Sequence, residues 1–577
     1  MAQAGAAGSG WDHSFDVVVV GSGAGGMAGA IRAKELGLET VLLEKSELYG
    51  GTTAFSGGGI WIPNNPQIDH DTPQEAWTYI RAATLNEVPE ERQRRYLQMA
   101  PKMLEWVHAK TRLRFMSVPR YADYNQQYPG AKPTRTMEPV FVDASQLGDE
   151  LKNLRPPLGV FAVFGAAMGQ AEAKIILSKE KGWTWLVAKL VLKYWLDLPW
   201  RFKSKLDRQL KLGSALVGGL RVSMMDRNIP LWLNTPMTDL ITENGRVVGV
   251  LAEQDGKPIR IQARRGVILA SGGFERDPEL RAKYLPGTDV EWATTPRSNT
   301  GDSLKACLKI GAATAYMNYA WWVPAVPLPG EPTARGLFAE RSLPGCVIVN
   351  NAGKRFADEA DDYNSFGWAM WKDNGANIPA WIIIDATFRQ KYPCGPLYPG
   401  MMMPDTVLPK EWADNIYYKA DSIAEIAAKT GIDRAGLEQT IANMNRYAAT
   451  GIDEEFHKGE NLYDVYYGDP NVKPNPCLAP IVKPPFYALK LVPGDIGSKG
   501  GMLTDVNGQV VDTKGQPIGG LYATGNCSAA VMGPGYPGPG STLGPAMTFG
   551  YLAASHIAGA NDIEAPAEPR KAPAAAQ

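Results

Sequence analysis

Apolar and polar positions in the first fifty residues follow a strand, helix, strand order. Residues 15–20 include four consecutive valines, which is typical of a fully buried parallel strand. Residues 27–36 have helical spacing, and residues 39–43 form a second apolar run. The chain is therefore expected to be an α/β protein organised around this first strand.

Similar patterns predict further elements. Helices are expected over 74–111, 422–449 and 546–557. Short strands joined by Asn-Gly and Asp-Gly turns are expected over 231–234, 247–251 and 259–261. A buried strand before the glycines at 272 and 273 predicts that the chain returns there to the first sheet, and 345–350 predicts a strand of a second region.

Residues 173–212 differ from the rest of the chain. Residues 183–200 are mostly apolar, and Lys189, Lys193 and Asp197 recur every four residues, so they form a narrow polar stripe on a helix. Two lysines, an aspartate and a proline interrupt the run, so it favours an interfacial helix over a membrane span. Flanking tryptophans and the basic segment 201–211 predict contact with anionic lipid. The alternative is packing on another domain or subunit.

The chain is longer than a single core usually supports, at 577 residues. We expect a dinucleotide-binding domain in three pieces, an inserted α+β catalytic (cap) domain and the helical membrane-associating insertion. The expected boundaries are 1–172, 213–295 and 485–560 for the three pieces, 173–212 for the insertion, 296–484 for the cap, and 561–577 for a disordered tail. Residues 1–10 are also expected to be a flexible tail without a targeting signal.

Composition excludes several classes of function. The net charge of −1 argues against a nucleic-acid partner. The five cysteines form no C-x-x-C pair and are interpreted as reduced cytoplasmic thiols. The five histidines are scattered, so no metal site is expected.

The first turn carries a dinucleotide-binding signal. Gly21, Gly23 and Gly26 give G-x-G-x-x-G between a strand and a helix, and Glu44 ends the next strand, where a carboxylate can bind a ribose. The glycines allow a tight turn, close approach to a pyrophosphate and close helix packing, which predicts a Rossmann-like domain. Ser22, Ala24 and Gly25 complete this turn.

A second segment rich in glycine and hydroxyl groups follows at 50–59 and favours FAD over a nicotinamide cofactor. No histidine lies in 50–59, so the FAD is expected to be non-covalent. A helix after the glycine-rich loop 533–544 would present amide donors to the flavin pyrimidine. The other expected cofactor residues are Lys45, Gly51, Thr52, Thr53, Ser56, Gly57, Gly58, Met237, Ser271, Gly272, Gly525, Asn526, Thr542 and Leu543.

With these motifs in place, the chain resembles the 3-ketosteroid Δ1-dehydrogenases of the fumarate reductase and succinate dehydrogenase flavoprotein superfamily. The resemblance rests on residues 50–65, on the Tyr-Pro-Gly-Pro-Gly segment 536–540, and on 544–551. It covers nearly the whole chain except 173–212, which resembles only the longer, membrane-associated members that act on sterol-derived ketones such as cholest-4-en-3-one.

The resemblance implies roles for particular residues. Removal of hydrogen from C1 and C2 needs oxyanion donors, a base for the C2 proton and transfer of the C1 hydride to flavin N5. Tyr536 and the Gly540 amide match the pair that holds the C3 oxygen. Tyr363 matches the base, and Tyr124 matches the tyrosine that hydrogen-bonds to it. Substrate contacts are expected from Tyr121, Trp322 and Pro537.

Other functions remain open at this point. A 3-ketosteroid Δ4-(5α)-dehydrogenase would use the same cofactor and ketone. A fumarate reductase would need histidine and arginine for a dicarboxylate, which the apolar, tyrosine-bearing motifs disfavour. A non-catalytic flavin-binding membrane protein is the alternative from another class. The favoured hypothesis is a cytoplasmic enzyme held peripherally on the inner membrane, with a quinone as acceptor.

Overall fold

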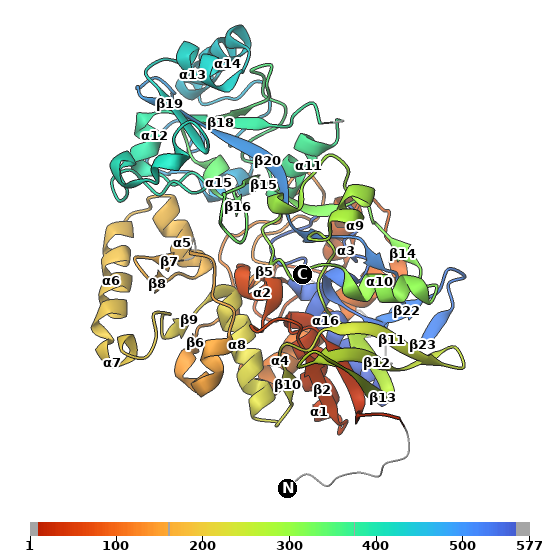
Figure 1. Ribbon diagram of the computed structural model, residues 1–577. Helices are drawn as coiled ribbons and strands as arrows, with labels where there is room; N and C mark the ends of the chain where they lie inside the picture. The colour runs from red at the N-terminus through yellow and green to blue at the C-terminus, as the bar shows by residue number, and fades with distance from the viewer. Residues whose placement is uncertain (1–9, 160–161, 374, 561–577) are drawn as a thin grey trace, which may run out of the picture.

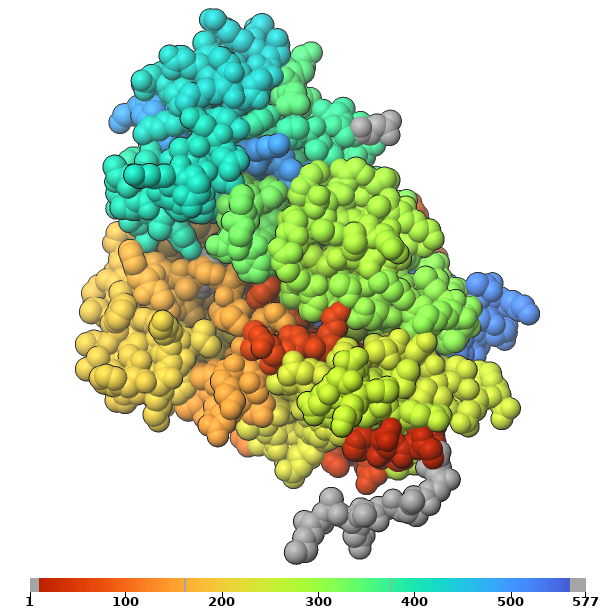
Figure 2. Space-filling view, in the orientation of Figure 1, coloured from red at the N-terminus to blue at the C-terminus, as the bar shows by residue number. Residues whose placement is uncertain are grey.

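The computed structural model describes residues 10–159, 162–373 and 375–560. The predicted tails, 1–10 and 561–577, lie outside the described residues except for residue 10. Figure 1 shows three parts: a dinucleotide-binding domain around the first strand, a cap above it, and a helical insert beside them. The insert lies against the first domain and beneath the cap in the space-filling view (Figure 2).

The first domain is built on an eight-stranded sheet in the order β10-β2-β1-β13-β12-β23-β22, with β11 beside β12. The strands are β1 His13–Val20, β2 Thr40–Leu43, β10 Leu231–Trp232, β11 Met237–Glu243, β12 Arg246–Gln254, β13 Lys257–Leu269, β22 Gln509–Val511 and β23 Pro517–Ala523. β1 lies between β2 and β13, parallel to both, and its valines are buried. The predicted central role of this strand is therefore confirmed.

Two helices of the first domain pack almost backbone to backbone. They are α1 Ala24–Glu35 and α16 Leu543–Ala558. A Cβ on Gly550 would lie 2.3 Å from the Gly25 carbonyl oxygen, so only glycine permits this approach. The helices α2 Gly51–Phe55, α3 Pro73–Ala83, α4 Glu90–Lys110 and α8 Leu212–Met225 complete this side. The beginnings of α1 and α16 thus meet at one place.

The cap is a six-stranded sheet in the order β16-β15-β20-β18-β17, with β19 paired to β20. Its strands are β15 Ala320–Val326, β16 Arg335–Gly336, β17 Cys346–Val349, β18 Ala380–Ile384, β19 Tyr417–Ala420 and β20 Phe486–Ser498. Its helices include α11 Tyr363–Trp371, α13 Ile423–Thr430, α14 Arg434–Thr450 and α15 Leu462–Tyr466.

The expected cap boundaries, 296–484, were wrong at both ends. Helix α10 Asp302–Lys309 packs on the first domain, where Leu304 shares a core with Val250 of β12. At the other end, β20 belongs to the cap sheet up to Ser498. The cap therefore spans about 320–498. The strands expected at 259–261 and before Gly272 are also one continuous strand, β13.

The insert contains α5 Gln170–Leu177, α6 Trp183–Leu196 and α7 Leu198–Arg201. The expected helix over 183–200 ends at Leu196, and Asp197 separates it from α7. Leu190 and Tyr194 are buried and pack against Val163 and Ala166. Within the described residues, no helix combines the length and apolar character needed to cross a bilayer.

Candidate active site

A cavity of about 870 Å³ lies where the three parts meet. Every expected cofactor residue except Gly26 borders it, and so do Tyr121, Tyr124, Tyr363, Tyr536 and Gly540. Residues from the first sheet, the cap and helix α5 of the insert contribute to one continuous wall. The space is large enough for an extended cofactor together with an apolar substrate.

The glycine turn after β1 has the conformation that its motif requires. Gly21 has a φ of 105°, and a Cβ there would lie 2.3 Å from the Ala270 carbonyl oxygen. A Cβ on Gly26 would lie 2.1 Å from the Gly21 carbonyl oxygen. Gly26 therefore lies between helix α1 and the turn, where it permits their close packing, and it does not border the cavity. This is the role that the motif assigns to its third glycine.

Hydrogen bonds join the glycine turn to the second glycine segment. Glu44 accepts from the Ser22 amide at 3.2 Å and the Ser22 hydroxyl at 2.5 Å, and that hydroxyl accepts from the Gly50 amide at 2.8 Å. Thr53 Oγ1 accepts from the first amide of α1 at 3.1 Å. The turn, the carboxylate and the second segment form one cradle, which fits the pyrophosphate and ribose of FAD.

Another part of the cavity wall is formed by the beginning of α16. Its N-cap, Thr542, makes no side-chain capping bond. The Gly544 amide donates to the Gly540 carbonyl at 2.9 Å and Pro545 has no amide hydrogen, so within the described residues it is the Leu543 amide of this first turn that is left open. Gly540 has a φ of 95°, and a Cβ there would lie 2.5 Å from the Ile60 backbone. The open Leu543 amide and the positive end of the helix dipole fit the pyrimidine edge of a flavin.

Three tyrosines form the centre of the cap side of the cavity. The Tyr363 hydroxyl donates to the Tyr536 hydroxyl at 2.9 Å. Tyr124 stands edge-on to both rings, with centroid distances of 5.5 Å to Tyr363 and 5.1 Å to Tyr536. All three side chains are buried. Residues 124, 363 and 536 thus come together from three distant parts of the chain.

Burial controls the acidity of these hydroxyls. Burial raises the pKa of Tyr536 to about 12, although the hydrogen bond from Tyr363 pulls it downward. Burial also raises the pKa of Tyr363 well above its usual value; Tyr536 adds to this rise, and nearby Tyr124 lowers it. The Tyr124 hydroxyl makes no hydrogen bond within the described residues. It is therefore free to donate to a Tyr363 that has lost its proton.

Two expected substrate contacts lie elsewhere. Trp322 faces away from the cavity and stacks on Trp371, with a centroid distance of 5.1 Å. Its neighbour Trp321 packs against Tyr536 instead, at 4.8 Å. Pro537 is also off the wall. Its carbonyl accepts from the Tyr124 amide at 2.9 Å and from the Tyr79 hydroxyl, so it ties the loop of Tyr124 to that of Tyr536.

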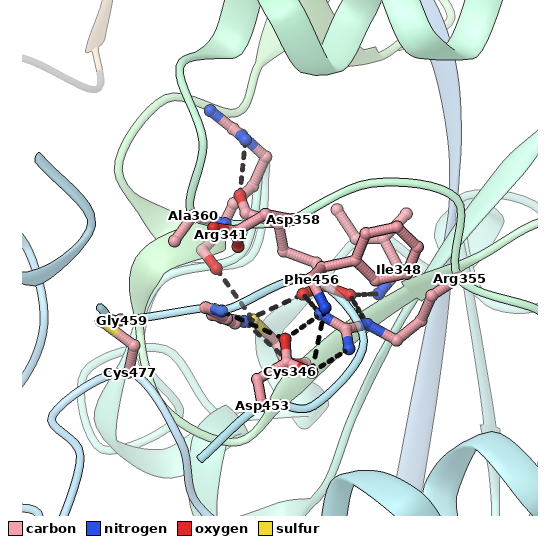
Figure 3. Close-up of polar contacts among 12 residues, drawn as sticks. Arg341, Cys346, Ile348, Arg355, Asp358, Ala360, Asp453, Phe456, Gly459 and Cys477 are labelled. Carbon is pink, nitrogen blue, oxygen red and sulfur yellow. Dashed lines mark hydrogen bonds and ion pairs between the residues drawn. The ribbon is translucent and has the colours of Figure 1, made fainter. Parts of the chain in front are cut away.

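Buried ion pairs hold the loop before Tyr363 (Figure 3). Arg355 makes paired contacts of 2.7–2.8 Å with Glu359 and Asp453. Arg341 donates to the carbonyls of residues 359 and 361. Asp362 then caps helix α11, whose first residue is Tyr363, by accepting from the amides of residues 364 and 365. The base candidate is therefore fixed at the start of a helix by a charged scaffold.

Several wall residues were missed from the sequence. Tyr463 stands 4.8 Å from the Tyr124 ring, and Phe338 stands 5.0 Å from Tyr363. The capped segment 461–467, with three tyrosines, carried a usable signal as an aromatic cluster. Phe338 carried none, because its approach to Tyr363 depends on tertiary packing.

The chain is similar to known flavoproteins over most of its length. The family described as "FAD binding domain" matches residues 16–543. A 3-oxosteroid 1-dehydrogenase of Mycolicibacterium smegmatis is 44% identical over 95% of this chain and 97% of its own. The chain is also similar to a crystal structure of a 3-ketosteroid Δ1-dehydrogenase from Sterolibacterium denitrificans in complex with 1,4-androstadiene-3,17-dione. The two are 50% identical, with a TM-score of 0.93, and the match covers 95% of this chain and 100% of the other.

A structure of a 3-ketosteroid-Δ4-(5α)-dehydrogenase from Rhodococcus jostii RHA1 is more distant. It is 22% identical, with a TM-score of 0.63, over 95% of this chain and 97% of the other. This likeness shows a shared fold only.

Proposed function

Because the chain belongs to the family of FAD-dependent 3-oxosteroid 1-dehydrogenases, we propose that its cavity binds a 3-ketosteroid with ring A between Tyr363 and Tyr536. The observation that carries this proposal is the facing pair of tyrosine hydroxyls, 2.9 Å apart, on a wall shared with Gly540. FAD, when bound, supplies the acceptor for the C1 hydride. Residues of the chain itself are proposed to bind the ketone, to donate hydrogen bonds to it and to take the C2 proton.

Tyr536 and Gly540 are proposed to hold the C3 oxygen. Within the described residues the Gly540 amide makes no hydrogen bond, so it is available to an oxygen in the cavity. The Tyr536 hydroxyl stays protonated at neutral pH, because its pKa is raised to about 12, and can donate. Two donors at the C3 oxygen would stabilise the negative charge that grows there as C2 loses its proton.

Tyr363 is proposed to take the C2 proton. When the C3 oxygen accepts the hydrogen bond of the Tyr536 hydroxyl, the Tyr363 hydroxyl must turn away from Tyr536 and toward C2. A tyrosine with a raised pKa is a strong base once ionised, and the free Tyr124 hydroxyl can donate to it. Burial of all three rings excludes water from the reacting carbons.

We further propose that the substrate is sterol-derived and reaches the cavity from a membrane surface. Exposed apolar side chains of the insert support this proposal, and exposed Lys189, Lys193, Lys203 and Lys205 lie among them. Trp183 and Val187 of α6 also border the cavity, so the insert forms part of its mouth. Lysines beside exposed tryptophans suit the interface of an anionic bilayer. A quinone dissolved in that bilayer is the proposed acceptor.

The test is anaerobic mixing of the purified protein with cholest-4-en-3-one, followed by flavin absorbance and by mass and NMR analysis of the product. Bleaching with a 1,4-diene-3-one product is expected. In a second mixing, with a 5α-reduced 3-ketosteroid, a product desaturated between C4 and C5 without reaction at C1 and C2 would instead favour the Δ4-(5α) alternative. Flavin that stays oxidised with this and with shorter 3-ketosteroids would overturn the proposal.

A further inference from the structure

Lys499 is a buried amine with no carboxylate beside it. It follows directly after β20 and is 1% exposed. Its backbone is held on both sides, by the Tyr319 carbonyl and the Ala530 amide, each at 3.0 Å. Within the described residues no carboxylate lies within ion-pair distance of its ammonium group, and burial lowers its pKa to about 7. A buried unpaired cation costs stability, so its presence calls for a compensating role.

The lysine side chain reaches the loop that carries Tyr536. Lys499 Nζ donates to the Pro534 carbonyl at 2.6 Å and to the Gly535 carbonyl at 2.8 Å. These are the two peptide groups immediately before Tyr536. Within the described residues, neither carbonyl has another hydrogen-bond donor. The loop is rich in proline and glycine, so its own backbone supplies few donors to fix it.

The same ammonium group also faces the ring that supports Tyr536 from the side. It lies 4.5 Å from the centroid of Trp321, and Trp321 packs edge-on against Tyr536 at 4.8 Å. A cation over an indole face is a favourable contact, strongest where water is excluded. Lys499 therefore contacts both the main chain before Tyr536 and the aromatic ring beside it.

We propose that Lys499 is a positioning residue that sets the direction of the Tyr536 hydroxyl for the reaction. The proposal rests on the function proposed above, because it acts through the oxyanion donor. Removing the lysine would leave two partly buried carbonyls without donors and let the loop shift. A displacement of about 1 Å at a reacting group can lower a rate about 100-fold.

The test is a double-mutant cycle measured by flavin reduction in a single turnover. Lys499→Met, which keeps length and loses the donors, should retain FAD and bind the steroid within about threefold of wild type, but reduce flavin roughly 10- to 100-fold more slowly. In a Tyr536→Phe background the same change should cost less than about threefold, because its target is gone. Lys499→Arg should recover part of the rate. Lys490→Met, an exposed change on the same strand, is the matched control.

Additive losses in the cycle would overturn the positioning role, as would loss of FAD from both Lys499→Met and Lys499→Gln, because the lysine would then serve the fold in general. Wild type and Lys490→Met that fail to reduce flavin with any 3-ketosteroid would instead contradict the proposed function. The two failures are therefore distinguishable.

Discussion

Aromatic side chains occupy opposite environments in the tyrosine centre and in the insert. Tyr124 and Tyr536 are 2% and 3% exposed, and hydrogen bonds tie their loops together. In the insert, Trp185 is 71% exposed and Phe202 is 91% exposed. Isolated exposed apolar residues are ordinary, but several large ones around one helix mark a surface that meets a partner or lipid. The contrast is the basis for the proposal that the tyrosine centre carries out the chemistry and the insert delivers the substrate.

The largest effect on the chemistry of the tyrosine centre is expected from Tyr363→Phe. The change removes the proposed base while keeping ring packing, so flavin reduction by a 3-ketosteroid should fall roughly 10²- to 10⁴-fold. Stopped-flow absorbance measures the rate, and the flavin spectrum checks that FAD remains bound. Near-normal reduction would exclude Tyr363 as the base.

Tyr536→Phe should lower the rate of flavin reduction somewhat less than Tyr363→Phe does. Loss of one oxyanion donor is expected to lower the rate roughly 10²- to 10³-fold, with the Gly540 amide still in place. Single-turnover kinetics and steroid binding should be measured together, since the loss should appear mainly in the rate. A variant with normal turnover would show that the C3 oxygen is held elsewhere.

Substitutions in the insert should weaken binding to membranes and leave the rate of the chemical step unchanged. Trp185, Leu192 and Leu196 point outward from α6, and each apolar side chain removed from water contributes about 1.5–3 kcal/mol. Changing all three to serine should weaken binding to anionic lipid vesicles at least about 100-fold in a sedimentation assay. Unchanged vesicle binding would favour the alternative of a subunit contact.

Substitution is a cleaner test than deleting residues 182–211. Deletion would remove Leu210, which pairs with Val142 of the first domain, and Lys211, which forms an ion pair with Glu172 at 2.6 Å. The three serine changes leave these contacts and the buried Leu190 and Tyr194 in place.

The most gradual expected effect is the dependence on pH, at no more than about tenfold per pH unit. Because burial raises the pKa of Tyr363 well above its usual value, the ionised fraction of this tyrosine grows tenfold per pH unit through the neutral range. Flavin reduction should therefore rise with pH up to at least about 9, and Tyr124→Phe should displace the rise to higher pH by removing the donor. A flat profile in wild type would argue against a tyrosine base.

The sequence predicted features that depend on local chain chemistry. The glycine turn, Glu44 and helix α16 carry their geometry in short spacings, so they were found where expected. Trp321 and Trp322 illustrate the limit: adjacent residues of a strand face opposite sides, and only tertiary packing decides which side meets Tyr536. The cap boundary failed for a similar reason. Pro484 and Pro485 do mark a break in the chain, but the strand that follows, β20, pairs with β15, β18 and β19 of the cap, and only tertiary packing decides which sheet a strand joins.

The most direct test of this division of labour compares the triple serine variant with wild type in single-turnover flavin reduction by dissolved 4-androstene-3,17-dione. The account predicts equal rates in solution, within about twofold, while reduction by cholest-4-en-3-one presented in anionic vesicles is slowed in the variant. A variant that loses its rate with the dissolved steroid as well would contradict the separation of chemistry from delivery.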